Sequence, residues 1–132
     1  MKNFVMFVGA VFVAIAGAGS TAADPAAGLW QTGVDRGTVA YVRIAPCGEA
    51  MCETIERSFN TEGEYQSPYI GKNILRNMVF GTSGEYVGRL WRPASGKQYY
   101  AKMTVSDASL TLHGCIAGGF ICGSQAWVRV GD

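Results

Sequence analysis

The sequence has a single histidine, His113, and it lacks the short motifs that bring histidine to catalysis or metal binding. H-E-x-x-H, G-x-S-x-G and a phosphate-cradling glycine loop are all absent. His113 alternates with Leu110 and Leu112, a pattern that directs the imidazole toward solvent rather than toward a nucleophile. We therefore predict that the protein is not an enzyme and uses neither a metal nor another cofactor.

Two pairs of neighbouring carboxylates remain as candidates for acid–base chemistry. They are Glu53 with Glu56, and Glu62 with Glu64. Acidic side chains at strand ends and in loops are usually solvated, and we expect these four to be solvated too. No catalytic role is assigned to them.

Charge of either sign is scarce. Charged residues make up 16% of the chain, and the formal net charge is +1. A nucleic-acid binder needs a basic patch to neutralise phosphates, which scattered and balanced charges do not supply. The composition therefore predicts no nucleic-acid partner, and it argues against attraction to anionic lipid.

The amino terminus lacks an apolar run long enough to span a membrane. Lys2 is followed by the uncharged run 4–18, whereas a spanning helix needs about 20 apolar residues. Small residues at 20–23 then provide a cleavage site, which predicts a signal peptide over residues 1–23, cut after Ala23 or alternatively after Ala22. We expect export to the periplasm, or alternatively to the extracellular space, with no membrane span after cleavage. A retained amino-terminal anchor is the other alternative.

Cysteine is limited to four residues, all after the predicted cleavage site. Of the three possible pairings, we favour Cys47 with Cys52 and Cys115 with Cys122, because each closes a short loop between strands. Their spacings differ from the C-x2-C of zinc knuckles and redox pairs. The cysteines are therefore predicted to form two structural disulfides in an oxidising compartment.

Apolar and polar residues alternate along most of residues 24–132, which is the pattern of half-buried strands. The whole chain has 18 glycines, and glycine and other turn residues separate these strands from one another. The predicted strands are 28–32, 38–45, 52–57, 78–80, 85–91, 98–105, 110–115 and 123–130. Since their connections are short, they favour antiparallel neighbours. We predict one all-β domain over residues 24–132, a small antiparallel up-and-down β-barrel of about eight strands, with a β-sandwich as the alternative.

The segment 58–74 departs from this pattern because it is polar and is interrupted by glycine and proline. It is predicted to be a long loop or a short helical turn. Within the predicted strands, the faces follow from the alternation. The expected core faces are Ala101, Met103 and Val105 in one strand, and Ala126, Val128 and Val130, opposite Gln125, Trp127 and Arg129, in the last.

Gly28-Leu29-Trp30 on the first strand and Arg129 on the last resemble the calycin arrangement of lipocalins and avidins. A longer set of landmarks resembles the exported bacterial family called domain of unknown function 2147. They are Asp24-Pro25-Ala26-Ala27-Gly28-Leu29-Trp30, Ile44-Ala45-Pro46-Cys47-Gly48 followed by Cys52, residues 92–99, Gly114-Cys115 and residues 121–130. The resemblance implies a periplasmic, lipocalin-like barrel without an established activity. Ala126 and Val128 depart from the T-W-T-R-V with which the family more often ends.

This resemblance gives Gly28, Trp30 and Arg129 a structural role in closing the barrel. Trp30 and Arg129 are expected to meet where the first and last strands come together. The guanidinium would lie across the indole ring and donate hydrogen bonds to nearby carbonyl groups.

Two functions of different classes remain open. One is a monomeric, non-catalytic envelope module that binds an unknown envelope protein; the other is a carrier of a small apolar ligand. For the carrier, the candidate lining residues are Trp30, Tyr41, Phe80, Trp91, Met103 and Leu112. A barrel of eight short strands is just wide enough to be filled by its own side chains, so we expect a filled interior and favour the module. The volume of any cavity discriminates between the two.

Overall fold

The computed structural model describes residues 24–82, 84–93, 95–116 and 121–132, and the regular elements in them are β-strands. No helix among these residues is long and apolar enough to cross a membrane. The predicted signal peptide, residues 1–23, lies outside the described residues. The strands are β1 (Gly28–Gln31), β2 (Val39–Cys47), β3 (Ala50–Asn60), β4 (Gly63–Tyr65), β5 (Leu75–Phe80), β6 (Tyr86–Arg92), β7 (Lys97–Val105), β8 (Ser109–Ile116) and β9 (Ile121–Gly131).

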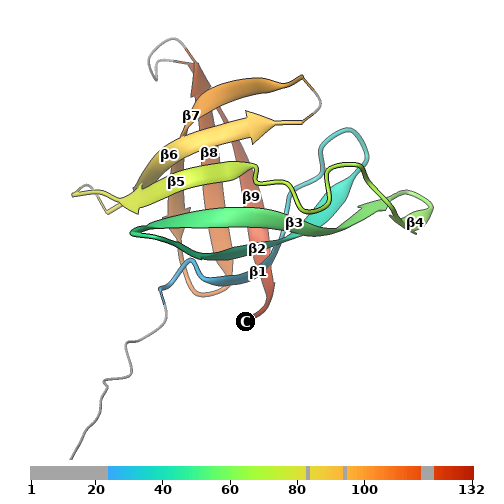
Figure 1. The fold of residues 1–132 in the computed structure, drawn as a ribbon, viewed down its shortest axis with the longest axis horizontal. Helices are drawn as coiled ribbons and strands as arrows, with labels where there is room; N and C mark the ends of the chain where they lie inside the picture. The colour runs from blue at the N-terminus through green and yellow to red at the C-terminus, as the bar shows by residue number, and fades with distance from the viewer. Residues whose placement is uncertain (1–23, 83, 94, 117–120) are drawn as a thin grey trace, which may run out of the picture.

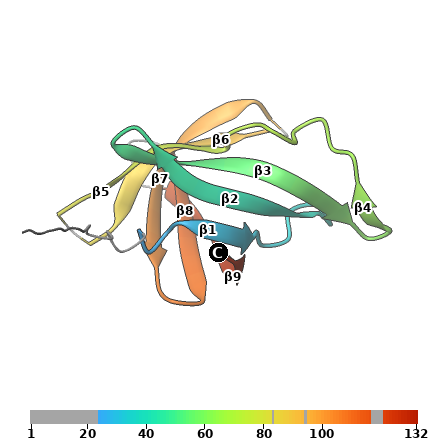
Figure 2. The ribbon, with the colours of Figure 1, turned by 60° about the horizontal axis from the view of Figure 1, so that its bottom comes forward.

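The strands form one antiparallel sheet that closes on itself (Figure 1). Their order is β2-β1-β9-β8-β7-β6-β5-β3-β4, and an additional pairing of β2 with β3 completes the ring. The short strand β4 pairs with β3 and projects to one side of the ring, as Figure 2 shows, so eight strands make the barrel. The predicted antiparallel barrel of eight strands is confirmed, and the sandwich alternative is wrong.

The segment 58–74 is more regular than predicted. β3 continues to Asn60, and β4 returns along it as a short hairpin. The residues after β4 then follow β3 in the opposite direction, because the N–H of Ile55 donates to the carbonyl of Lys72 and the N–H of Gly71 donates to the carbonyl of Ile55. Backbone pairing therefore orders a stretch whose polar side chains suggest a loop, and the prediction of a long loop or helical turn is wrong for its first half.

The core lies inside the ring, and it corrects the face predicted for the last strand. In β9, Trp127 is 1% exposed, whereas Val128 and Val130 are 48% and 40% exposed. Both faces of this strand carry apolar residues, so alternation alone cannot choose between them, and the large indole gains most from burial. In β7 the expected face is correct, since Ala101 and Met103 have no exposed surface.

One disulfide joins Cys47 to Cys52 across the β2–β3 hairpin, with the two Cα atoms 5.7 Å apart. It spans the turn at Gly48, whose φ of 74° suits glycine. The register places Cys115 of β8 directly opposite Cys122 of β9. The side chain of Cys122 lies outside the described residues, so this second pair stays a prediction.

We expect the loss of the Cys47–Cys52 disulfide to lower the free energy of unfolding by only about 2 kcal/mol, because the loop that it closes is short. The measurement is urea unfolding of the double variant C47S/C52S beside the parent. A variant that cannot fold would contradict this expectation. It would show that the hairpin depends on the covalent link rather than on its own backbone ladder.

Candidate functional site

The barrel interior contains an open cavity of about 620 Å³ at the end of the barrel where β1 finishes and β2 begins. Its inner wall includes the buried residues Ile55, Ser58, Leu112 and Trp127. The described lining residues are Thr32, Gly33, Asp35, Arg36, Thr38, Val39, Ala40, Ile55, Ser58, Tyr65, Ser67, Tyr69, Ile74, Leu90, Trp91, Arg92, Pro93, Tyr99, Leu112, Gly114, Gly123, Ser124, Gln125 and Trp127. This volume is typical of small-molecule sites, and the expectation of a filled interior is wrong.

Missing side chains help to keep this space open. Gly114 of β8 and Gly123 of β9 lie directly opposite each other, and both line the cavity. A Cβ atom on Gly123 would meet nothing within 4 Å, so this position faces free volume, whereas one on Gly114 would lie 2.9 Å from Cδ2 of Leu90, another lining residue. Glycine inside a strand often marks such a place, and this signal in the sequence could have indicated the cavity.

Of the six lining residues predicted from the sequence, Trp91 and Leu112 do line the cavity. Trp30 and Met103 have no exposed surface and lie in the packed core instead. The other two predictions are wrong. Tyr41 packs against Phe59, with ring centroids 4.9 Å apart, and it is not part of the lining. Phe80 is 61% exposed, at the end of β5.

Aromatic and charged groups form the exposed rim of the cavity. The ring of Tyr69 meets the ring of Trp91 edge to face at 6.2 Å, and the guanidinium of Arg76 lies 5.5 Å from the Trp91 centroid. Arg92, the next residue along β6, contacts both carboxylate oxygens of Asp35 through Nη2, at 3.2 and 3.3 Å. This ion pair connects the β1–β2 turn to β6 across the opening.

Glu53 lies on the inward face of β3 and has no exposed surface. Its Oε1 accepts hydrogen bonds from the backbone N–H groups of Ile74 and Leu75, at 3.0 and 3.4 Å. Its Oε2 has no hydrogen-bond partner in the described part of the chain. Burial raises the pKa of Glu53 to about 8, and the two backbone hydrogen bonds offset only part of this rise. The expectation that Glu53 is solvated is therefore wrong.

The buried carboxyl connects two neighbouring strands where their backbone ladder is short. The backbone pairing between β3 and β5 places Met51 opposite Met78. Where β5 begins, the side chain of Glu53 accepts from the backbone N–H groups of Ile74 and Leu75, and the side-chain amide of Asn73 donates to the Glu53 carbonyl at 2.7 Å. Glu53 does not line the cavity, so we assign it to the barrel wall rather than to the site.

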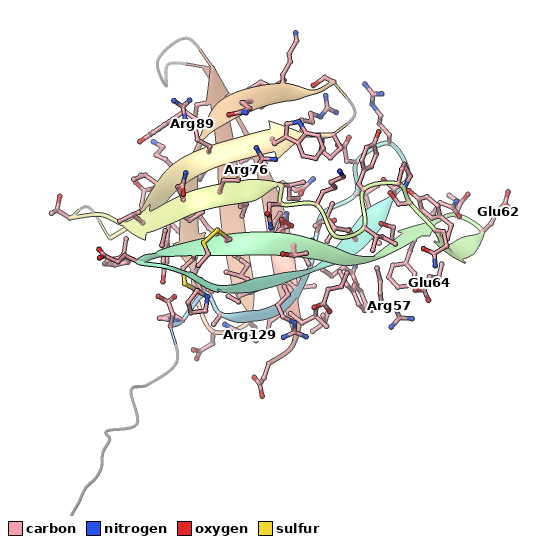
Figure 3. The ribbon with its side chains drawn as sticks, in the orientation of Figure 1. Arg57, Glu62, Glu64, Arg76, Arg89 and Arg129 are labelled. Carbon is pink, nitrogen blue, oxygen red and sulfur yellow. A yellow bond between two sulfur atoms is a disulfide. The ribbon has the colours of Figure 1, made fainter. Side chains whose placement is uncertain are left out.

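The other three candidate carboxylates are exposed, as expected. Glu56 accepts a 2.8 Å bond from Arg43, and Glu64 forms a two-bond ion pair with Arg57 beside β4, visible with Glu62 in Figure 3. Glu56 is on the exposed face of β3, and Glu62 and Glu64 belong to the β3–β4 hairpin, so none of the three shares the buried position of Glu53.

The end of the barrel opposite the cavity is closed by Trp30 and Arg129, of which Figure 3 labels Arg129 beside β1. The guanidinium carbon of Arg129 lies 4.3 Å from the centroid of the Trp30 ring. Arg129 donates to the carbonyl groups of Asp107, Ala27 and Pro25 at 2.7, 2.8 and 2.6 Å. This is the geometry that the closure prediction expects, and none of the five residues lines the cavity.

Gly28 makes the approach of Arg129 possible. A Cβ atom at this position would lie 2.6 Å from Arg129 Nη1 and 3.0 Å from the carbonyl oxygen of Gly131, and the φ of 139° also favours glycine. The segment before β1 adds to the closure, since Trp30 Nε1 donates to the carbonyl of Ala26 at 2.9 Å. Glycine is therefore required where the first and last strands meet.

A model of the family described as "Uncharacterized protein conserved in bacteria (DUF2147)" matches residues 28–129. The chain belongs to the DUF2147 family. None of the curated protein sequences matches it. A solved structure from Helicobacter pylori, described as a protein of the lipocalin family, is similar with a TM-score of 0.65 and 14% identity, over 84% of this chain and 86% of that one. At this identity the likeness shows a shared lipocalin-like barrel and nothing about a ligand.

The DUF2147 landmarks fall at both ends of the barrel. Gly28 and Arg129, which bound the matched region, form the closed end. The landmark 92–99 follows β6 at the open end, where Arg92, Pro93 and Tyr99 line the cavity. The two departures from the family ending, Ala126 and Val128, are exposed side chains outside the lining, so they do not alter the cavity.

His113 is half-buried on β8, opposite Lys102 of β7 and Ser124 of β9, and it is not part of the cavity lining. Among the described residues, no group of three or more His, Cys, Asp or Glu side chains is placed to hold a metal ion. Neither His113 nor the buried Glu53 is part of the cavity wall.

Proposed function

We propose that this DUF2147 protein binds a small, largely apolar molecule in the cavity of its barrel and carries out no chemistry on it. The single observation that supports this proposal is the open volume of about 620 Å³, which lies within the range of small-molecule sites. A closed barrel that only displays loops needs no such volume. We therefore prefer the carrier function to the envelope interaction module that the sequence favoured.

We further propose that the protein works in the periplasm as a monomer. The Cys47–Cys52 disulfide supports an oxidising compartment, and the amino-terminal residues have the pattern of a signal peptide. The closed barrel supports a monomer, since closure pairs the eight barrel strands with one another and leaves the three-residue strand β4 with a free edge.

Filling the cavity tests the carrier function. Ala40 lines the cavity from β2, so Ala40→Trp places an indole in the open volume. We expect the parent to bind the neutral fluorescent probe N-phenyl-1-naphthylamine saturably, and Ala40→Trp to weaken this binding by about tenfold or more. Fluorescence titration measures both affinities.

The matched control is Ala126→Trp, which adds the same side chain at an exposed position of β9. It should bind the probe like the parent. If the parent shows no saturable binding, or if the two variants lose affinity equally, the cavity is not a binding site. Native mass spectrometry of the protein purified from its source then identifies any retained molecule by mass.

A further inference from the structure

The charged groups of the cavity are concentrated at its mouth. Among the described lining residues, the ionised side chains are Asp35, Arg36 and Arg92, and all three have exposed surface. The buried wall, which includes Ile55, Leu112 and Trp127, carries no charge. These three lining residues give a formal charge of +1 above an apolar interior, and Arg76, which lies against Trp91 at the rim, adds a further positive charge.

The ion pair across the mouth is one that a competing anion can replace. Arg92 reaches Asp35 through a single nitrogen, Nη2, at 3.2 and 3.3 Å, rather than by the parallel two-nitrogen pairing that gives arginine its strongest carboxylate contacts. The side chains of Arg92 and Asp35 are 35% and 48% exposed. Exposed pairs of this kind are weak, so Arg92 remains available to another carboxylate or phosphate.

Arg36 stands at a backbone position that disfavours arginine. It has a φ of 55° and is followed by Gly37 with a φ of 75°, between Asp35 and Thr38, which exchange both backbone hydrogen bonds. Two successive residues of positive φ make a tight hairpin turn in which Asn or Gly is usual at the first position. The turn holds an exposed arginine among the residues that line the cavity, as Arg92 also does.

We propose that the ligand is an amphipathic anion, whose carboxylate or phosphate group binds Arg36 and Arg92 at the mouth and whose apolar part lies in the barrel. This inference rests on the proposed function and narrows it to one class of ligand. Asp35 is the internal competitor for Arg92, and its displacement by the anion releases the β1–β2 turn from β6. Charge complementarity at the mouth selects the anion, since a neutral molecule of the same shape gains nothing from the guanidiniums.

Three probes of one chain length test the proposal: decanoate, decyl phosphate and 1-decanol, each measured by displacement of N-phenyl-1-naphthylamine. We expect the two anions to bind about tenfold more tightly than the alcohol, with a preference that falls as salt is added. Arg92→Gln should remove most of this preference, so that the affinities for the two anions fall toward the affinity for 1-decanol. A preference for decanoate over decyl phosphate, or the reverse, identifies the anionic group.

Two further variants give changes that general damage to the fold would not produce. Asp35→Asn removes the competitor, so it should increase the affinity for the anions severalfold relative to that for 1-decanol. Arg36→Asn places a residue that tolerates positive φ in the turn, so it should raise the melting temperature while it weakens anion binding. Lys102→Gln is the control for loss of a positive charge, because Lys102 is on β7 and does not line the cavity. It should change neither the affinity for the anions nor the affinity for 1-decanol.

The outcomes separate this inference from the proposed function. If 1-decanol binds as tightly as decanoate in the parent, and if Arg92→Gln and Asp35→Asn leave all affinities unchanged, the cavity binds ligands without selecting an anion. The inference is then overturned and the carrier function remains. If none of the three probes displaces N-phenyl-1-naphthylamine from a protein that binds it, the inference is overturned as well. If the parent binds nothing at all, both fail.

Discussion

Glu53→Gln is expected to make the protein more stable than the parent by about 4 kcal/mol at pH 8, and this advantage should disappear near pH 4. The folded pKa of Glu53 is about 8, whereas the unfolded value is 4.5. Between these values the unfolded chain gives up a proton that the folded barrel keeps. The free energy of unfolding of the parent therefore falls as the pH rises from 4.5 to 8. Glutamine keeps an oxygen that can accept from Ile74 and Leu75, and it has no proton to lose.

Urea unfolding at several pH values between 4 and 9 measures this difference. The comparison of parent with variant at each pH cancels the titration of all other groups. Glu56→Gln is the matched control, because Glu56 is on the same strand but is exposed and paired with Arg43. Parallel pH curves for the parent and Glu53→Gln would show that Glu53 does not titrate differently in the folded protein, and would overturn the assignment.

Arg129→Ala should lower the free energy of unfolding by about 2 to 3 kcal/mol while leaving affinity for cavity ligands unchanged. The substitution removes the guanidinium from the Trp30 ring and leaves three backbone carbonyls without their donor. It acts at the closed end of the barrel, and Arg129 does not line the cavity. We therefore expect Arg129→Ala to lower stability without changing ligand binding.

Thermal melting, carried out beside the N-phenyl-1-naphthylamine titration, checks both parts of this prediction. Arg89→Ala on β6 removes an exposed arginine and should melt like the parent (Figure 3). Arg129→Lys should lie between the parent and Arg129→Ala, because an ammonium group cannot reach three carbonyls in the fixed geometry of the guanidinium. An Arg129→Ala protein that melts with the parent would mean that the closure contributes little.

The sequence predicted the barrel and its closure well, because both depend on local patterns. Strands of period two with short turns restrict the chain to antiparallel neighbours, and the G-x-W start with a late arginine indicated where the ring joins. The face of β9 could not be obtained in this way. Trp127 and its neighbours Ala126 and Val128 are all apolar, and only the pairing with β8 and β1 determines which of them points inward.

Glu53 shows another reason why the sequence was insufficient. The alternation of Met51, Glu53 and Ile55 does place the carboxylate on the inward face. Acidic side chains are usually solvated, however, and this general rule led to the wrong expectation for Glu53. The buried position becomes tolerable through Ile74 and Leu75, about twenty residues away, whose N–H groups face the carboxyl. A long-range contact of this kind leaves no periodic signal. The cavity could not be predicted for the same reason, since its volume depends on which side chains from distant strands meet inside the ring.

The position of β1 between β2 and β9 has a consequence for the order in which the protein can acquire its structure (Figure 1). The chain is made from its amino terminus, yet the partners of Pro25 and Ala27 are supplied by Arg129, 104 and 102 residues later. Until that residue has been synthesised, one edge of β1 has no neighbour and the ring stays open. The hairpins β2–β3 and β6–β7 join neighbours in the chain and can form earlier, whereas completion of the ring requires that β9 has been synthesised. During this interval the open edge is the part of the molecule most liable to pair with another chain.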